Sequence, residues 1–150
     1  MKRFMIAMLL TFSSLNLFAG VDTGTDDNDV VLAGHDTVAY HTEGKPVLGK
    51  PDITAVYNGA IYRFSSTKNR NNFVANPAKY APAYGGYCAL GTSLGKKFQV
   101  DGKAFEVVDG QLYVNKNLKV YKSWKKDIPG NLKKSEANWP KIRDIAANEL

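Results

Sequence analysis

The segment "ITAVYNGAIYRFSS", residues 53–66, alternates apolar and polar side chains on both sides of Asn58-Gly59. Such alternation is typical of strands with one buried face, and an Asn-Gly pair readily adopts the positive φ angles of a two-residue turn. The segment therefore predicts a β-hairpin. A second hairpin is predicted over residues 105–115, "FEVVDGQLYVN", where Asp109-Gly110 separates two strand-like runs.

Helices are expected after each hairpin. Ser65 or Ser66 can cap a helix over 67–76, which ends before Pro77 because the residue preceding a proline avoids the helical region. After the second hairpin an apolar stripe with a spacing of three residues predicts an amphipathic helix. This stripe consists of Leu118, Tyr121 and Trp124.

The C-terminal part is expected to contain two further short helices. Pro129-Gly130 is expected to end the amphipathic helix, and the tail over 131–150 is helical in composition. Pro140 lies inside that tail, so we expect two short helices meeting near Trp139. The fold class predicted from all these elements is α+β, with a small antiparallel sheet of two hairpins packed with short helices in a single domain.

The N-terminus has the layout of a secretory signal peptide. Lys2 and Arg3 precede an apolar run over 4–12, and small and polar residues lead to Ala19. The run is too short to span a bilayer as a helix, so we expect cleavage after residue 19, a periplasmic location and no stable membrane anchor afterwards. A retained N-terminal anchor is the alternative.

The mature chain is expected to contain one domain. Residues 1–19 form the signal peptide, 20–30 a flexible lead-in, and 31–150 the domain with its C-terminal helical extension. The formal charge of the whole chain is +6, but its lysines are scattered and no phosphate-binding loop is present. Because the chain is also expected to be exported, we expect no nucleic acid among its partners.

Two longer stretches resemble a known family. Residues 55–66, "AVYNGAIYRFSS", and 76–89, "NPAKYAPAYGGYCA", are similar to a YHS domain, specifically the exported bacterial branch of YHS domain-containing (seleno)proteins. The resemblance begins at "AGHDTVAYHTEGKPVLGKP", residues 33–51, and continues through "DIPGN" and "ANWP". YHS domains are found attached to copper-transport ATPases, monooxygenase subunits and sensors, so the resemblance implies a role near metals or redox chemistry.

The chain departs from the metal-binding pattern of better-known YHS domains. By resemblance, Ala39 stands at the position of the first cysteine, and Ser65 and Asn69 stand at the positions of two others. None of these side chains is a good ligand for a soft metal. A site built from several thiolates is therefore excluded. Related members carry selenocysteine at the place equivalent to Cys88, which implies redox chemistry or soft-metal ligation there.

The stretch "YGGYCALG", residues 84–91, contains the only cysteine of the chain. Tyr87, Leu90 and Leu94 have helical spacing, with Gly95 beyond them and Gly85-Gly86 as the turn before them. Cys88 is then expected in the first helical turn, where free backbone N–H groups favour a thiolate. Tyr84, Tyr87 and the two glycines would surround it. The alternative is a buried cysteine that acts as a small apolar side chain.

Both histidines of the chain lie in "GHDTVAYH", residues 34–41, and imidazole can join a thiolate on copper or zinc. If this segment is extended, His35 and His41 lie on one face about 20 Å apart, so they share an ion only if the chain bends. Asp36 is a further candidate, either as a turn former or as the group that orients an imidazole. Structural roles are the alternative for both histidines.

Tyrosines are dense in the same part of the chain: Tyr40, Tyr62, Tyr80, Tyr84 and Tyr87. They are expected to pack in the core or, alternatively, to line a pocket for a metal, haem or flat organic molecule. The favoured function is an exported binding module for a soft metal, most simply copper, or one linked to redox chemistry through Cys88. A thiol-dependent redox enzyme and an accessory subunit that docks an envelope protein are the alternatives.

Overall fold

The computed structural model describes residues 20–150, so the predicted signal peptide lies outside the described residues. The chain folds as a single α+β domain with two antiparallel hairpins and short helices, as the sequence predicts. In chain order the elements are η1 (Leu32–Gly34), α1 (Thr37–Thr42), β1 (Lys50–Tyr57), β2 (Ala60–Phe64), α2 (Thr67–Ala75), α3 (Pro77–Tyr80), η2 (Ala83–Gly86), α4 (Ala89–Ser93), β3 (Phe105–Val108), β4 (Gln111–Val114), α5 (Leu118–Trp124), η3 (Lys125–Asp127), α6 (Ile128–Ile142) and η4 (Ala147–Glu149).

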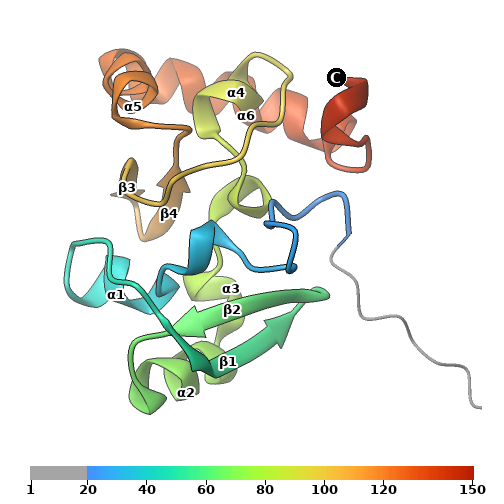
Figure 1. Cartoon of the computed structure of the whole chain (residues 1–150). Helices are drawn as coiled ribbons and strands as arrows, with labels where there is room; N and C mark the ends of the chain where they lie inside the picture. Colours follow the sequence, from blue (N-terminus) through green and yellow to red (C-terminus); the bar gives the residue numbers. More distant parts are fainter. Residues whose placement is uncertain (1–19) are drawn as a thin grey trace, which may run out of the picture.

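The two hairpins lie at opposite ends of the molecule (Figure 1). Strands β1 and β2 lie beside α2 and α3 at one end, and β3 and β4 lie with α4, α5 and α6 at the other. Both turns are those predicted, because Asn58 and Gly59 have φ angles of 51° and 76°, and Asp109 and Gly110 have 50° and 79°.

One hydrophobic core joins the two ends. On β2, Tyr62 and Phe64 face the ring of Phe73 in α2, with ring centroids 4.5 and 5.1 Å away. Side chains from β4 complete the same cluster, so neither hairpin has a core of its own. The buried residues of the cluster are Val31, Leu32, Val38, Tyr40, Ala60, Tyr62, Phe64, Phe73, Tyr80, Leu112 and Val114.

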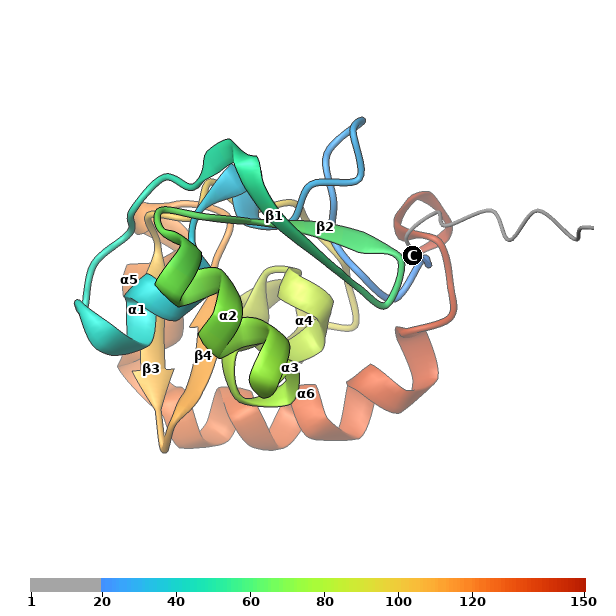
Figure 2. The same ribbon diagram turned by 90° about the horizontal axis from the view of Figure 1, so that it is seen from below.

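The C-terminal helices differ from the prediction. The expected helix over 118–124 is present as α5, but Pro129 begins the next helix instead of ending this one. A proline fits the first helical turn because its missing N–H has no partner there, and Asp127 caps the turn by accepting from Gly130 N at 2.9 Å. Helix α6 then runs as one element along α4 (Figure 2).

The prediction of two short helices meeting near Trp139 is wrong, because α6 continues through Pro140 to residue 142. A proline removes one backbone hydrogen bond, but here the next one is kept, since Arg143 N donates to Trp139 O at 2.9 Å. Packing of the buried Ile142 side chain also holds the last turn.

The segment 20–30, predicted as a flexible lead-in, lies against the domain. Gly24 N donates to Gly85 O at 2.8 Å, and Val30 forms a parallel bridge with Ile61 of β2. Among residues 20–150, no helix combines the length and the apolar character needed to cross a membrane.

The carboxylate of Asp36 is fully buried and connects three elements. Its Oδ1 caps α1 by accepting from Val38 N at 2.9 Å and from Ala39 N at 3.3 Å. Its Oδ2 accepts from Ser65 N at 2.8 Å, from Ser65 Oγ at 2.7 Å and from Asn69 Nδ2 at 2.8 Å. The start of α1, the end of β2 and the first turn of α2 are therefore fixed to one another by a single side chain.

Replacing Asp36 with alanine should lower the free energy of unfolding by about 3 kcal/mol or more. The change removes a helix cap, which contributes about 1 kcal/mol, and leaves the Ser65 and Asn69 donors without a partner at about 1–3 kcal/mol each. Urea denaturation measures the loss. The control is Asp127→Ala, which removes an exposed cap with one hydrogen bond and should cost only about 1 kcal/mol. Equal losses in the two variants would contradict this role of Asp36.

Candidate functional site

Cys88 is the N-cap residue of α4, one position before the helical turn in which the sequence places it. Its Sγ accepts a hydrogen bond from Gly91 N at 3.4 Å, and the thiol donates to Asn115 Oδ1 at 3.6 Å. The helix ends as predicted at Gly95, where Gly95 N bonds to Thr92 O and Lys96 N bonds to Gly91 O. The sulfur atom is therefore fixed by backbone geometry on one side and by an amide on the other.

The Cys88 pocket is a cavity of about 250 Å³ at the surface of α4. Its walls are mainly apolar, and two of them are well exposed, since Leu94 is 66 % and Phe98 is 40 % exposed. Lys116 is the one charged residue of the lining, and its Nζ lies 5.1 Å from the centre of the Phe98 ring. The lining consists of Cys88, Leu90, Gly91, Leu94, Phe98, Lys116 and Val120.

Cys88 itself is 1 % exposed, yet it belongs to the lining of this cavity. The alternative prediction is a buried cysteine that acts as a small apolar side chain. This agrees with the low exposure of Cys88 but does not account for its place in the wall of a cavity. The hydrophobic cluster between the hairpins does not include it. A ligand that enters the pocket would therefore meet a sulfur atom set in an apolar wall.

Asn115 is a site residue that sequence reasoning missed. It is fully buried, its backbone N donates to Ala104 O at 2.7 Å, and its Oδ1 accepts from both Leu90 N and the Cys88 thiol. In the sequence, Asn115 is one of two asparagines at the end of the second hairpin, and asparagine is common where strands end. Nothing local distinguishes a buried amide from a turn residue there.

The structure does not bring either histidine to Cys88. The segment that would place both on an extended strand instead forms α1, because Asp36 caps a helix at this point. His35 precedes the helix and is buried, and its Nδ1 donates to Leu32 O at 2.8 Å. A carbonyl oxygen can only accept, so this ring nitrogen carries the proton and is not free to bind a metal.

His41 lies in the last turn of α1 with its ring edge-on to Tyr80, 5.4 Å between ring centroids. Its Nε2 is buried and has no hydrogen-bond partner within residues 20–150. Burial, together with the nearby Lys79 ammonium, lowers the pKa of His41. The imidazole is therefore held in its neutral form by its surroundings.

The predicted metal-site residues remain separate from one another. Asp36 has both carboxylate oxygens occupied by hydrogen bonds within the fold. Over the range 20–150, no three side chains of His, Cys, Asp or Glu gather in a geometry that could hold a metal ion. Cys88, His35 and His41 thus do not form a common site.

The residues next to Cys88 in the sequence attach the N-terminal segment. Tyr87 donates its hydroxyl to Val21 O at 3.1 Å, and a Cβ atom on Gly85 would lie 1.8 Å from Asp22 O. Gly85, with a φ angle of 61°, therefore admits the lead-in backbone at close range, whereas Gly86, with 83°, lies against the side chains of Pro82 and Leu32.

The two remaining tyrosines of the predicted site pack in the structure. Tyr40 is buried, and its hydroxyl donates to Gly102 O at 2.5 Å. Burial raises the pKa of Tyr40, with Asp101 and Asp36 adding to the effect. The ring of Tyr84 lies 5.8 Å from that of Tyr113 and 5.9 Å from that of Trp139. Neither lines the Cys88 pocket.

The fold and the pocket together define a small α+β domain that presents one thiol in an apolar wall. The model of the YHS domain family matches residues 38–84, so this segment is similar to a YHS domain. The match covers less than half of the chain, from α1 to η2, and ends before Cys88 and its pocket. No curated protein and no solved structure matches the chain significantly.

The lowered pKa of His41 predicts a pH-dependent contribution to stability. Near pH 6.5 the unfolded chain binds more protons at this histidine than the folded chain does, so the free energy of unfolding should decrease as pH falls through that range. We expect His41→Asn, which carries no titratable group, to lose this part of the slope. Urea denaturation of both proteins between about pH 7.5 and about pH 5.5 measures it. Parallel slopes would show that His41 titrates alike in both states.

Proposed function

We propose that this protein is an exported YHS-domain binding module whose function is linked to redox chemistry through Cys88. The observation that carries the proposal is the position of the only cysteine, which lines an apolar pocket of about 250 Å³. Small-molecule sites combine apolar walls with a few polar or charged groups that orient the ligand. Here the sulfur of Cys88 supplies the reactive atom and Lys116 the charge.

The pocket fits reversible thiol–disulfide exchange with a small disulfide. The Cys88 thiolate attacks one sulfur of the ligand, a bond forms between the two sulfurs, and the ligand's own S–S bond breaks. The other half leaves as a thiolate and takes up the proton that Cys88 lost. Because the chain has no second cysteine, the thiol that reverses the reaction comes from a small molecule or an envelope protein.

Two sequence features support an exported, redox-linked role. Residues 1–19 have the layout of a signal peptide, and disulfides persist in the periplasm to which such a peptide leads. The resemblance to the exported YHS branch, in which related members carry selenocysteine at the place equivalent to Cys88, supports a reactive atom there.

Copper is the soft metal that the family resemblance implies, and the residues present do not fit a closed copper site. Cys88 offers one sulfur, and its polar neighbour Asn115 offers an amide oxygen that already accepts from Leu90 N. Copper sites in proteins use several thiolate, thioether or imidazole ligands. A copper ion at Cys88 would therefore need ligands from outside the described residues, such as those of an envelope partner.

The charge of Lys116 makes a prediction about which disulfides react. We expect dithiodipropionate, which is anionic, to form a mixed disulfide with Cys88 faster than cystamine, which is cationic, with bis(2-hydroxyethyl) disulfide between them. Lys116→Gln should reduce the ratio of the reaction rates of the two charged reagents at least threefold. Lys119→Gln, an exposed lysine outside the pocket lining, is the matched control and should leave it unchanged. Mass spectrometry follows the reactions.

Two results would contradict this proposal. The first is a protein that forms no mixed disulfide until it is denatured, which would show a purely structural Cys88. The second is consumption of peroxide over many turnovers with an added reductant, which would identify a thiol-dependent enzyme.

Competition with a chelator tests the copper interpretation. We expect an equimolar Cu(I) chelator to remove the ion from the isolated protein, because a single thiolate provides too few soft ligands. If instead one equivalent of Cu(I) stays bound, and Cys88→Ser weakens that binding more than tenfold, about 1.4 kcal/mol, the protein is a copper-binding module. His41→Asn is the control in that titration, since His41 is not part of the Cys88 pocket.

A further inference from the structure

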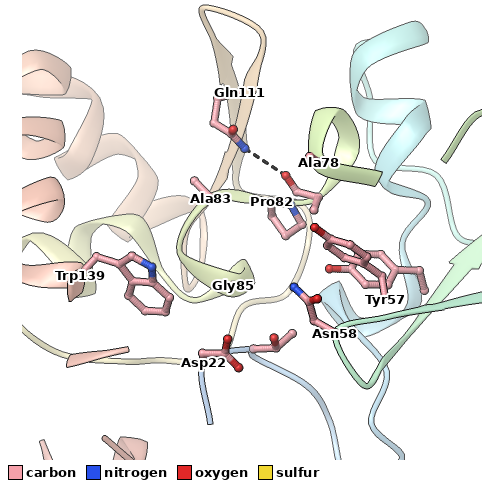
Figure 3. Close-up of a pocket in the computed structure, with 12 residues that line it drawn as sticks. Asp22, Tyr57, Asn58, Ala78, Pro82, Ala83, Gly85, Gln111 and Trp139 are labelled. Carbon is pink, nitrogen blue, oxygen red and sulfur yellow. Dashed lines mark hydrogen bonds between the residues drawn. The ribbon is translucent and has the colours of Figure 1, made fainter. Parts of the chain in front are cut away.

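A second pocket, of about 300 Å³, lies where segments from both ends of the domain meet. Figure 3 shows Tyr57 and Asn58 from the first hairpin on one side, Trp139 from α6 on the other, and Asp22 of the lead-in segment nearby. The two pockets have no lining residue in common. We refer to this cavity as the Trp139 pocket.

Tyr62 shows that the Trp139 pocket is suited to a polar ligand. The residue is only 3 % exposed, yet it lines the cavity, and its hydroxyl forms no hydrogen bond with any residue in the range 20–150. A hydroxyl that faces a cavity can bond to what occupies the cavity. Burial raises the pKa of Tyr62, so the hydroxyl stays neutral and can both donate and accept.

The charge of the lining selects against anions. Asp22 is its one charged residue among the described positions, and no lysine, arginine or histidine contributes to it. The aromatic rings of Tyr57, Tyr62 and Trp139 add their negative faces. The remaining polar side chains are those of Thr23, Asn58 and Gln111. The Gln111 amide is held in place because its Nε2 donates to Ala81 O at 3.0 Å (Figure 3).

One ring of the lining, that of Trp139, already lies beside a positively charged side chain of the protein itself. Lys97 Nζ lies 5.5 Å from the centre of the Trp139 ring and 5.2 Å from that of Tyr87. It does not line the Trp139 pocket, and it donates to Val21 O, Arg143 O and Ile145 O at 2.8, 2.6 and 2.6 Å. Trp139 thus already has the Lys97 ammonium against its π-system, and Asp22 lies close enough to act on the charge of Lys97 as well.

We propose that the Trp139 pocket binds a small organic cation, a protonated or quaternary amine that carries a hydroxyl or similar polar group. The ammonium lies among the aromatic rings with Asp22 as its counter-charge, and the polar end bonds to the Tyr62 hydroxyl. A volume of about 300 Å³ is at the lower limit of small-molecule sites, so the ligand is small and haem is excluded from this cavity. This inference is independent of the chemistry at Cys88.

Choline and its uncharged isostere 3,3-dimethylbutan-1-ol form a matched pair of probes. They have nearly the same shape and the same hydroxyl, and differ in one positive charge. Calorimetric titration of the purified protein at constant ionic strength should show binding of choline, with the isostere about tenfold weaker, as expected for a cation–π site with a counter-charge.

Three variants separate the contributions. Asp22→Asn should weaken choline at least threefold and leave the isostere unchanged, whereas Tyr62→Phe should weaken both probes because it removes only the hydroxyl. Tyr113→Phe removes a tyrosine hydroxyl outside the lining and should change neither affinity. Thermal unfolding of all three variants checks that each one keeps the fold.

Several outcomes would overturn the proposal. They are equal affinities for the two probes, no binding of choline at tens of millimolar, or an affinity that Asp22→Asn does not change. Binding of a neutral sugar in place of choline would show that the rings and amides recognise hydroxyl groups without a cation, and would overturn it as well.

Discussion

The buried carboxylate of Asp36 is the constraint on which the rest of the structure depends. Transfer of a charge into a protein interior is tolerated only when hydrogen bonds replace the lost water, and Asp36 receives five of them. The donors come from α1, from the end of β2 and from α2, and the first hairpin separates α1 from the other two in the sequence. The position of the first hairpin relative to both helices is therefore set by a polar group, and the apolar core fills the space that this group defines.

The same network occupies the place where the YHS domains that this segment resembles have a metal site. By resemblance, Ala39, Ser65 and Asn69 stand where better-known YHS domains carry cysteines, and all three donate hydrogen bonds to Asp36. The positions thus converge on one point of the fold, but they hold a carboxylate by N–H and O–H groups instead of a soft ion by thiolates. Any chemistry of a thiol must then take place elsewhere. The one thiol of the chain lies beyond the matched segment, at Cys88.

Local sequence patterns predicted the elements whose determinants are local. The Asn58-Gly59 and Asp109-Gly110 turns and the helix capped by Ser66 needed only neighbouring residues, and all are present. Helix α1 could not be predicted in this way, because its cap Asp36 is stabilised by Ser65 and Asn69 from the far side of the first hairpin. Sequence reasoning singled out Cys88 but not its pocket, whose wall includes Phe98 and Lys116 from later segments.

Helix α6 connects the two pockets. Ser135 Oγ donates to Ala89 O at 3.2 Å and Asn138 Nδ2 donates to Ser93 O at 3.0 Å, so α6 contacts both ends of the short helix that Cys88 begins. The next residue along α6 is Trp139, which lines the second pocket. Helix α6 is therefore the packed element that the lining of one pocket and the helix of the other pocket have in common.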